Sequence, residues 1–509
     1  MPRSDNAAYW FVDRHLREGR ADKTAFLEAG TGRQLTYGDL AEQSSQLGGA
    51  FQRIGMRREE RVACLILDQI EYPAILFGAM KAGVVPVLIN TLLSPDLYDA
   101  ILRDSRASLL IVSETLYPAV KDKLKTNPYI GHVIVIGDAP NGTISFTEFQ
   151  DQRAHLDSIE VSGDDCAFWL YSSGSTGQPK GVRHVHSALR ATADTYGKHV
   201  LGIREDDVVL SAAKLFFAYG LGNAVTFPMS VGASTILWGG RPDPQNMCDF
   251  IAKYQPTIFC GVPTLYASMV AHLEAEGAPE HALRQCISAG EALPADVGTR
   301  FEDLMGVSIL DGVGSTEMLH IFLSNAPGDV EYGTSGIAVP GYDLRLVDET
   351  GAEVAPDTVG ELLVRGASSA DGYWNQRAKS RVTFEGEWTR TGDKYERRAD
   401  GRYVYCGRTD DMFKVSGIWV SPFEVEQAII AHPAVLEAAV VPWLDDDGLA
   451  KPKAFVVLKD EAKADGFADA IKSFVKDQIG KWKYPRHVEL VSDLPKTATG
   501  KIQRYKLRA

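Results

Sequence analysis

Short apolar segments of strand length alternate with longer amphipathic segments through most of the chain. RVACLILD, SLLIVSE and HVIVIG come first, and VVLSAA, STILWGG, PTIFCGVP, QCISAG and VSILDGV follow. These runs are continuously apolar instead of alternating with polar residues, which is typical of strands buried on both faces of a mainly parallel sheet. The pattern therefore predicts an α/β fold, in which helices cover sheets of mainly parallel strands.

The most apolar stretch is YPAILFGAMKAGVVPVLIN, residues 72–90. A membrane-spanning helix needs about 20 uninterrupted apolar residues, and this stretch contains Lys81, Gly83 and two prolines. It is better explained as a buried helix followed by a buried strand. The N-terminus, MPRSDNAAYWFVDRHL, has no apolar core of the kind found in signal peptides. We expect no membrane partner and a cytoplasmic protein.

The texture of the chain changes after about residue 330. ELLVRG, YVYCGR, FVVLKD and HVELV read as short strands, and helices are expected near 422–432 and 465–480. This mixture predicts a smaller α+β domain. The polar, glycine-flanked stretch 407–417 is the expected boundary, so we predict a large domain over 1–408 and a small mobile domain over 409–509.

Composition and charge narrow the function. The chain has 509 residues with 45% hydrophobic and 24% charged residues, which indicates a globular protein of two or more domains. A net charge of −14 disfavours nucleic acid as a partner. From residue 471 onward ten Lys or Arg stand against three Asp or Glu, which fits either a solvated tail or a phosphate-binding end. The six cysteines lack zinc or disulfide spacing. The oligomeric state is left open, with a homodimer among the options.

One stretch is unusually rich in glycine and hydroxyl groups: YSSGSTGQPKG, residues 171–181. It fails the Walker pattern twice, lacks the spacing of a serine nucleophile elbow, and contains no GxGxxG. Its glycines permit close backbone approach, its N–H groups can form an anion-binding nest, and Lys180 adds a positive charge. From these residues alone, a phosphate cradle and a solvent loop both remain open.

Five further motifs occur in a fixed order with this loop. They are SAGEALP (288–294), GVGSTEM (312–318), EWTRTGD (387–393), GRTDDMFKVSG (407–417) and PKTATGKIQR (495–504). Together the six resemble the acyl-adenylate-forming enzymes, which include acyl- and aryl-CoA ligases, adenylation domains and luciferases. The resemblance covers essentially the whole chain. It implies that ATP and CoA are co-substrates, that Mg²⁺ is required, and that the loop folds over the ATP phosphates.

The resemblance also assigns roles to residues that match the family motifs. Catalysis would fall to Lys501, Thr316 and Glu317, with Glu317 as the Mg²⁺ ligand and Lys501 as the positive charge that assists adenylation. Asp393 and Arg408 would contact the ribose. The full set expected to bind ATP is Ser172, Ser173, Gly174, Ser175, Thr176, Gly177, Lys180, Gly290, Glu291, Ala292, Asp311, Gly312, Val313, Gly314, Ser315, Thr316, Asp393, Arg408 and Lys501.

Each assignment has an ordinary structural alternative. Glu317 would suit the N-terminus of a helix, Asp393 would suit a turn after Gly392, and Arg408 would suit a surface position. Val313 stands where the family usually has an aromatic residue beside adenine. The resemblance therefore implies aliphatic packing against the adenine ring in this chain.

KLFFAYGLGN (214–223) and GVGSTEMLHIFLSN (312–325) are most similar to the benzoate- and hydroxybenzoate-CoA ligase branch. This similarity implies a small aromatic carboxylate as substrate. The residues expected to line the acid pocket are Phe217, Ala218, Tyr219, Gly220, Ser288, Ala289, Gly312, His320 and Ile337. The aromatic residues among them could equally be ordinary core residues. His184 and His186 look like loop residues without a role.

The remaining expectations concern the second half-reaction. Asp410 resembles the family hinge about which the small domain rotates, and Lys414, Ser416 and Gly417 would border the CoA thiol tunnel. The alternatives are a ligase for another small carboxylate, a stand-alone adenylating enzyme for amino or aryl acids, luciferase-type oxygenation, and a nucleotide sensor. FFAYG offers no acid to pair with an α-ammonium group, and Lys501, Glu317 and Asp393 are all present. The sequence thus favours an AMP-forming aryl-CoA ligase.

Overall fold

The computed structural model describes residues 5–150, 155–173, 179–415, 418–444, 450–459, 466–480, 483–496 and 502–508. The chain forms two compact units. One consists of Met1–Leu344 with Val364–Thr389, and the other of Arg345–Leu363 with Arg390–Ala509. The boundary expected at residue 408 separates the part of the chain that rotates from the part that does not. The division into compact units does not test this property, so the boundary stays a proposal.

The first sheet of the larger unit has the strand order β19-β9-β8-β4-β3-β5-β6-β7. Strands β8, β4, β3, β5, β6 and β7 are parallel to one another, while β9 is antiparallel to both β8 and β19. Their bounds are β3 Arg61–Leu65, β4 Val85–Leu88, β5 Leu109–Ser113, β6 His132–Ile136, β7 Ile144–Ser145, β8 Cys166–Ser173, β9 Pro179–Val185 and β19 Gly372–Tyr373. The mainly parallel sheet expected from the apolar runs is confirmed.

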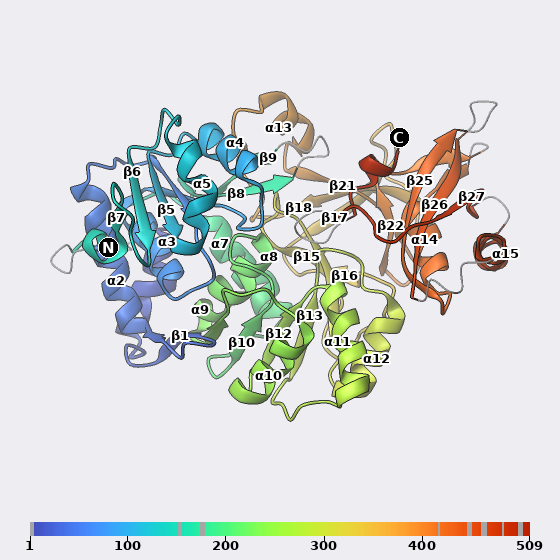
Figure 1. Cartoon of the computed structure of the whole chain (residues 1–509), viewed down its shortest axis with the longest axis horizontal. Helices are drawn as coiled ribbons and strands as arrows, with labels where there is room; N and C mark the ends of the chain where they lie inside the picture. Colours follow the sequence, from blue (N-terminus) through green and yellow to red (C-terminus); the bar gives the residue numbers. More distant parts are fainter. Residues whose placement is uncertain are drawn as a thin grey trace. The chain divides into compact units, whose positions relative to one another are not determined.

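Helices pack against this sheet, as Figure 1 shows in blue and cyan. They are α2 Tyr37–Arg53, α3 Glu71–Ala82, α4 Pro95–Ser105, α5 Tyr117–Leu124 and α6 Phe146–Phe149. Helix α2 begins with a capping box, in which Thr36 and Asp39 satisfy each other's backbone N–H groups. Helix α3 ends at Gly83 in the left-handed conformation, and β4 follows. The most apolar stretch is thus the buried helix and strand that its sequence predicts.

The second sheet of this unit has the order β16-β15-β14-β13-β12-β10-β11-β1-β2. Its bounds are β1 Thr24–Glu28, β2 Gln34–Thr36, β10 Val208–Ser211, β11 Ser234–Leu237, β12 Ile258–Gly261, β13 Gln285–Ser288, β14 Ile309–Gly314, β15 Ile321–Ser324 and β16 Ile337–Ala338. The strands from β14 to β1 are parallel to one another. Helices α10 (Pro244–Tyr254), α11 (Pro263–Glu276) and α12 (Ala295–Met305) lie side by side (Figure 1), and the apolar core between them and the sheet includes Phe259, Tyr266 and Phe301.

Three π-helical segments are described in the larger unit: η1 (Tyr9–Asp13) precedes α1 (Arg14–Arg17), η3 (Ala193–Val200) follows α7 (His186–Thr192), and η4 (Gly222–Thr226) joins α8 (Ala218–Leu221) to α9 (Phe227–Val231). π-helical turns are rare and often occur at functional sites. The remaining elements of this unit are η2 Glu114–Leu116, α13 Arg377–Thr383 and β20 Phe384–Glu385.

The smaller unit has its own apolar core, to which α14 and α15 contribute Val425, Ile429, Ile471 and Val475. Its helices are α14 Pro422–Ile430, α15 Phe467–Ile479 and the short η6 Arg504–Leu507, close to the two helices expected here. Its strands are β22 Tyr403–Arg408, β23 Phe413–Val415, β24 Ile418–Val420, β25 Val435–Leu444, β26 Ala450–Leu458 and β27 His487–Leu490, while β17 Asp343–Val347, β18 Val359–Arg365 and β21 Trp388–Arg397 run from one unit into the other. The α+β character expected for this region is confirmed.

Candidate active site

The carboxyl ends of neighbouring parallel strands gather the residues expected to bind the acid. Strand β10 leads to Phe217 and α8, β13 ends at Ser288, and β14 carries Asp311 and Gly312. Ser288 is paired in register with Gly261 of β12 on one side and with Asp311 of β14 on the other. In open α/β sheets, ligands bind outside these strand ends. The fold therefore brings segments far apart in sequence to one edge.

Two buried polar atoms at this edge have no partner with strict hydrogen-bond geometry among the described residues. They are Ser288 Oγ and Asp311 Oδ1, on neighbouring strands β13 and β14, and Ser288 still lies close enough to Asp311 to favour the ionised carboxyl. The other oxygen of Asp311 accepts a long hydrogen bond of 3.4 Å from Leu293 N. Burial raises the pKa of the Asp311 carboxyl to about 8. Unpaired buried polar atoms are costly, so they indicate where a polar group of a ligand would bind.

His320 is buried in a cluster of aromatic rings. Its centroid lies 5.1 Å from that of Tyr196, 5.7 Å from Tyr219 and 4.5 Å from Phe227. Neither ring nitrogen has a partner with hydrogen-bond geometry. Burial lowers the pKa of the imidazole to about 3, so the ring is neutral at pH 7. A neutral His320 can donate from one nitrogen and accept at the other.

Tyr219 contributes its ring, because its hydroxyl is already engaged. The hydroxyl donates to the carbonyl of Gly261 at 3.1 Å and to that of Ile287 at 3.0 Å. Of Tyr219 and His320, it is therefore His320 that can offer a hydrogen-bonding group to a ligand in the expected pocket.

Glycines are required where the segment after β10 folds tightly. A Cβ on Gly220 would stand 2.1 Å from the carbonyl oxygen of Lys214. A Cβ on Gly222 would stand 2.3 Å from His320 Cδ2 and 2.7 Å from Nε2. Contacts below 3.0 Å cannot persist without movement, so Gly222 sets how closely the helix approaches the imidazole.

The part of the site expected to bind phosphates centres on Glu317. This residue lies on a turn after β14 and not at the start of a helix. Lys180 Nζ is 3.4 Å from Glu317 Oε1, and Tyr373 Oη donates to the same oxygen at 2.8 Å. Burial alone would raise the pKa of the Glu317 carboxyl, but the Lys180 charge and the Tyr373 hydrogen bond hold it below its ordinary value. Glu317 is therefore a carboxylate at neutral pH, the form that binds a cation.

This turn is held by its own backbone and by neighbours. Ser315 Oγ accepts the Met318 N–H at 3.1 Å, and Ala370 N donates to the Glu317 carbonyl at 2.8 Å. A Cβ on Gly314 would stand 2.5 Å from the His320 carbonyl oxygen, because the chain folds back from β14 into β15. Thr316 and Ser315 are half-buried on the same turn.

The glycine-rich loop connects β8 to β9, which pair as an antiparallel hairpin with Ser172 opposite Lys180 and Ser173 opposite Pro179. Ser172 Oγ is buried without a hydrogen-bond partner. The loop residues themselves lie outside the described part of the chain: Gly174, Ser175, Thr176 and Gly177. The hairpin thus places Lys180 directly after the loop, in contact with Glu317.

The expected adenine wall is more exposed than the acid pocket. Gly290 and Glu291 are exposed directly after β13, and Ala292 and Val313 are half-buried. Among the expected pocket residues, Ala218 and Ala289 are buried and Phe217 is half-buried, whereas Ile337 is 44% exposed. Ile337 is opposite Ser324 of β15, and Ser324 is opposite Gly312 of β14. Ile337 therefore lies two strands away from Gly312.

In the smaller unit, Asp393 of β21 is opposite Arg408 of β22. Arg408 Nη1 donates to Asp393 Oδ1 at 2.9 Å and to the Thr391 carbonyl at 3.2 Å. The two predicted ribose-binding residues are thus one ion pair, with Asp393 itself buried. Their assignment to ribose stays a prediction.

Of the residues expected in the second half-reaction, Asp410 is exposed on a turn after β22, and Lys414 lies in β23. Ser416, Gly417 and the adenylation lysine Lys501 lie outside the described residues. Several basic residues of the C-terminal region form ion pairs inside this unit, Lys483 with Glu424, Lys496 with Glu437 and Arg504 with Glu426. These pairs offset part of the local positive charge.

The structure corrects the interpretation of two histidines. His184 lies within β9 and His186 begins α7, and both are buried instead of lying in a loop. His184 stacks on Phe168 at 5.0 Å, and His186 Nδ1 accepts the Ala7 N–H at 3.1 Å. Alternate residues of a strand face the same side. The apolar Val182, two residues before His184, therefore indicated that the two could share a buried face.

Sequence reasoning also missed residues that the fold brings to the site. Tyr373 belongs to a strand of two residues and falls outside the six motifs, yet it contacts Glu317 and Lys180. Tyr196 and Phe227 pack on His320 from η3 and α9. Only their aromatic character was visible in the sequence.

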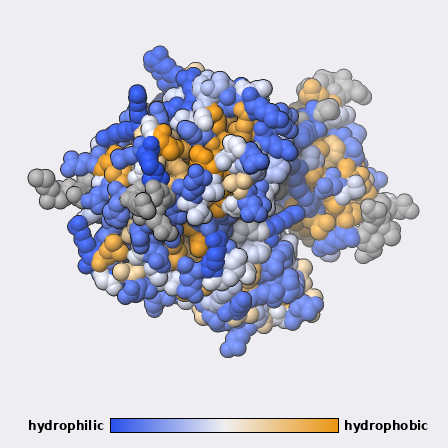
Figure 2. All heavy atoms as spheres, turned by 60° about the vertical axis from the view of Figure 1, so that its left-hand side comes forward, coloured by the Kyte–Doolittle hydropathy of each residue, from blue (hydrophilic) through white to orange (hydrophobic). Residues whose placement is uncertain are grey.

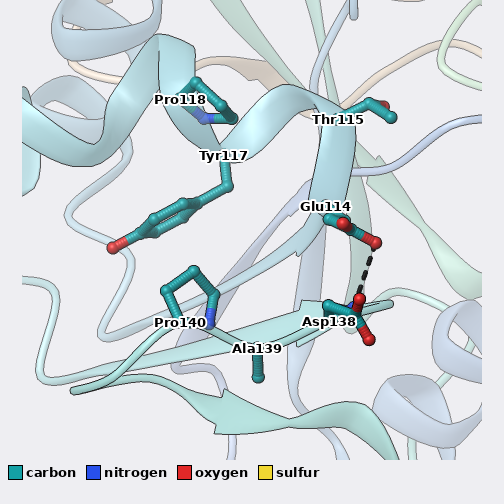
Figure 3. A pocket seen from close by; sticks show the side chains of 7 residues that line it. All are labelled: Glu114, Thr115, Tyr117, Pro118, Asp138, Ala139 and Pro140. Atoms are coloured by element: carbon teal, nitrogen blue, oxygen red, sulfur yellow. Dashed lines mark hydrogen bonds between the residues drawn. The ribbon is translucent and has the colours of Figure 1, made fainter.

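A surface hollow of about 490 Å³ lies away from these residues, where β5 and β6 end. Figure 3 shows the Tyr117 ring beside Pro140, and Glu114 accepting the Asp138 N–H at 3.0 Å. Its polar groups are satisfied or solvated, so it does not resemble the orphaned polar edge described above. On the face in Figure 2, apolar residues form patches bordered by hydrophilic ones. Across the described residues, every helix is too short or too polar to span a bilayer.

Comparison with known proteins fits this geometry. The family model described as AMP-binding enzyme matches residues 12–374, and the model of the AMP-binding enzyme C-terminal domain matches 424–501. The 4-hydroxybenzoate–CoA/benzoate–CoA ligase of Rhodopseudomonas palustris is 51% identical over 100% of this chain and 95% of its own. The benzoate–CoA ligase of Thauera aromatica is 51% identical over 100% and 97%. A solved benzoate CoA ligase from Burkholderia xenovorans LB400 superposes with a TM-score of 0.90 at 49% identity, covering 99% of both chains.

Proposed function

Because the chain belongs to the AMP-binding enzyme family, we propose that it joins a benzoate-type acid to CoA, using ATP and releasing AMP and pyrophosphate. The observation that carries this proposal is similarity over the whole chain: 51% identity to ligases for benzoate and 4-hydroxybenzoate, with both family models matched. The resemblance found in the sequence, to the benzoate and hydroxybenzoate branch of acyl-adenylate-forming enzymes, is confirmed.

The first half-reaction joins two anions. A carboxylate oxygen of the acid attacks the α-phosphorus of ATP, the bond to pyrophosphate breaks, and an acyl-adenylate forms. We assign phosphate binding to the loop 172–177 with Lys180, and support for this comes from Lys180 lying beside Glu317 at the base of the loop. Catalysis of this kind is mainly positioning and charge neutralisation.

We assign Mg²⁺ to Glu317. The carboxylate is anionic and half-buried next to the expected phosphate site, which fits a cation that keeps most of its ligands as water and phosphate oxygens. Among the described residues no group of three or more His, Cys, Asp and Glu could hold a metal by itself. Bound there, Mg²⁺ would neutralise charge on the phosphates.

In the second half-reaction the CoA thiol attacks the acyl carbon and AMP leaves. We assign Asp410 as the hinge of the rotation between the two steps, and Lys414, Ser416 and Gly417 to the path of the thiol. We also propose a cytoplasmic location, where ATP and CoA are available, and leave a homodimer as a question for size-exclusion chromatography with light scattering.

The acid pocket is assigned to the aromatic cluster around His320. Tyr196, Tyr219 and Phe227 surround a neutral imidazole whose two nitrogens have no partner with hydrogen-bond geometry among the described residues, so this wall is aromatic and carries the imidazole as a polar group. A benzoate ring fits such a wall, and a 4-hydroxyl group would meet His320 as donor or acceptor. We therefore expect turnover of both benzoate and 4-hydroxybenzoate.

The test is release of AMP and pyrophosphate with MgATP, measured with and without CoA. The acids are benzoate, its hydroxy, amino and fluoro derivatives, cinnamate, a medium-chain fatty acid and several amino acids. CoA-dependent turnover confined to small benzoates supports the proposal. Turnover of fatty or amino acids instead would reject the aryl pocket and leave the ATP site in place.

Lys501→Ala tests the assigned adenylation lysine. Loss of a preorganised charge costs about 3 kcal/mol or more, so acid-dependent pyrophosphate exchange should fall at least a hundredfold. Thioester formation from supplied acyl-adenylate and CoA should persist. Unchanged exchange in this variant would reject the role of Lys501, and Lys472→Ala, on exposed α15, serves as the control.

A further inference from the structure

Each of the three side chains of Tyr373, Lys180 and Glu317 contacts the other two. Tyr373 Oη donates to Glu317 Oε1 at 2.8 Å, and Lys180 Nζ donates to that carboxylate oxygen and to the tyrosine oxygen, each at 3.4 Å. Lys180 Nζ also lies 4.5 Å from the centroid of the Tyr373 ring. The tyrosine therefore contacts both the proposed metal-binding carboxylate and the proposed phosphate-binding lysine.

The segment that carries Tyr373 fixes Glu317 at two points. Ala370 N donates to the Glu317 carbonyl at 2.8 Å, and Tyr373 holds the side chain. The segment is itself anchored on β9, because Tyr373 is opposite Val182 and Trp374 N donates to the Gly181 carbonyl at 2.8 Å. Contacts with one short strand, β19, thus fix the positions of both Glu317 and Lys180. The Tyr373 side chain that contacts both of them is buried.

The two contacts to Glu317 differ in charge, and this difference matters when a nucleotide enters. Lys180 attracts both the carboxylate and the incoming phosphates, so its interaction with Glu317 weakens when it turns to the phosphates. The Tyr373 hydroxyl is neutral, so phosphates do not compete for it by charge. It also leaves the full negative charge of Glu317 available to a cation.

We propose that Tyr373 is a positioning residue that holds the Glu317 carboxylate in place for a divalent cation when Lys180 engages the nucleotide phosphates. The inference rests on the proposed function, since it takes Glu317 and Lys180 in the roles assigned there. It predicts that the Tyr373 hydroxyl acts on metal affinity and leaves nucleotide and acid affinity nearly unchanged.

The test variant is Tyr373→Phe, which removes the hydroxyl. It keeps the ring next to Lys180 and next to Phe384, whose ring centroid is 5.4 Å from that of Tyr373. A matched control exists in Tyr332→Phe. That half-buried hydroxyl donates to Glu302 Oε2 at 2.7 Å and accepts the Ile309 N–H at 3.0 Å, so the control also removes a tyrosine–glutamate hydrogen bond, far in sequence from the glycine-rich loop.

Four quantities are measured: binding of Mn²⁺ by electron paramagnetic resonance with a non-hydrolysable ATP analogue, binding of that analogue in EDTA, the Mg²⁺ dependence of pyrophosphate release, and the KM for the acid. For Tyr373→Phe we expect Mn²⁺ affinity to fall about tenfold and the Mg²⁺ requirement to rise about tenfold, as for a lost hydrogen bond to a charged group. Metal-free analogue binding and the KM for the acid should stay within about twofold of wild type. Tyr332→Phe should match wild type in every measurement.

Wild-type Mn²⁺ affinity in Tyr373→Phe would overturn the proposal. So would an equal loss of metal-free analogue binding, because that result would mean general damage to the site. Failure of the proposed function is seen separately, in the wild type, as absence of acid- and ATP-dependent turnover. Failure of the Tyr373 inference is seen only in the difference between the variant and the wild type.

Discussion

Gly222 has a hydrogen atom where other residues have a Cβ, and this allows η4 to approach His320 closely. The backbone there is helical, with φ −59° and ψ −59°, so alanine fits the conformation. Its Cβ would nevertheless stand 2.3 Å from His320 Cδ2 and 3.1 Å from Phe227 Cζ. The imidazole is enclosed by three aromatic rings and must move as a whole.

We therefore expect Gly222→Ala to raise the KM for benzoate about tenfold or more, while the KM for ATP changes less than about twofold. Steady-state kinetics with each substrate varied in turn give both values. Gly131→Ala is the control, because its Cβ would meet only the Ser108 carbonyl oxygen at 3.7 Å, an ordinary contact. An unchanged benzoate KM in Gly222→Ala would separate His320 from the acid pocket.

Two buried histidines link the stability of the larger unit to pH. His15 Nε2 is 2.6 Å from the Met229 carbonyl, and His186 Nδ1 accepts the Ala7 N–H. Burial lowers the pKa of each imidazole to about 4, compared with about 6.5 in an unfolded chain. Between these values the unfolded chain binds more protons, so the stabilisation is complete above pH 6.5 and is lost as the pH falls towards 4.

For His186 this linkage is worth about 2 kcal/mol between pH 7.5 and pH 5. His186→Gln keeps an acceptor for the Ala7 N–H and removes the titration. We expect its unfolding midpoint in urea to drop less between the two pH values than that of wild type. His132→Gln, on the exposed face of β6, should behave as wild type. Equal pH dependence in wild type and His186→Gln would contradict the linkage.

At the scale of elements, the C-terminal segment is fastened by a buried ion pair between Arg504 and Glu426, beside the contacts of Arg504 and Arg508 with Asp411. Arg504 donates to both carboxylate oxygens of Glu426, from Nε at 3.0 Å and from Nη2 at 2.6 Å, and Glu426 also accepts the Val440 N–H at 2.7 Å. Arg504 lies in η6, Glu426 in α14 and Val440 in β25. Lys496 and Ile502 form an isolated antiparallel bridge just before this segment, so the described residues on either side of 497–501 are tied to each other.

Arg504→Met should destabilise the smaller unit by about 3 kcal/mol, since it leaves the Glu426 carboxylate buried without its partner. Adenylation should slow with it, because Lys501 loses an anchor. In the double variant with Glu426→Gln, the buried charge is gone and the Val440 N–H keeps an acceptor, so most of the stability should return. Thermal unfolding and pyrophosphate exchange measure the two effects.

The exposed pair of Lys472 and Asp469 on α15 supplies the control for that prediction. Surface pairs of this kind contribute about 0.5 kcal/mol or less, so Lys472→Met should change the unfolding temperature little. If Arg504→Met were equally silent, the ion pair would not be what fastens the segment.

The fold was predictable where local pattern decides it. Parallel strands such as β5, LLIVS, are buried on both faces and read as continuous apolar runs, and glycines such as Gly83 mark helix ends. The π-helical segments were not predictable, because the hydrophobic pattern around Phe227 does not distinguish them from an α-helix. Their shape comes from packing around His320, which depends on residues far along the chain.

The candidate site divides in the same way. Glu317 and Asp393 were found because their motifs carry them, and the structure adds that Glu317 is anionic and that Asp393 is paired with Arg408. Tyr373 could not be found, since its contact with Lys180 and Glu317 joins three separate parts of the sequence. Hydrophobic periodicity reports which face of an element is buried and gives no information on such long-range contacts.

At the scale of the whole molecule, the hinge role proposed for Asp410 means that the chain there would change conformation between the two steps. The turn there is short: Asp411 N and Met412 N both donate to the Arg408 carbonyl at 3.1 Å, and Thr409 N donates to the Gly392 carbonyl at 2.9 Å. Few backbone angles are therefore free to absorb a rotation, and Asp410, exposed at the centre of the turn, is the position that can vary.

Proline at this position fixes φ near −65° and removes one of those angles. We expect Asp410→Pro to affect the two half-reactions unequally, with one retained within about threefold and the other reduced at least a hundredfold. Pyrophosphate exchange measures the first half-reaction, and thioester formation from supplied acyl-adenylate and CoA measures the second. Asp410→Ala keeps the backbone free and removes the same carboxylate, so it should support both. Equal losses in Asp410→Pro, or a matching loss in Asp410→Ala, would mean that the side chain or the fold of the turn matters and not its rotation.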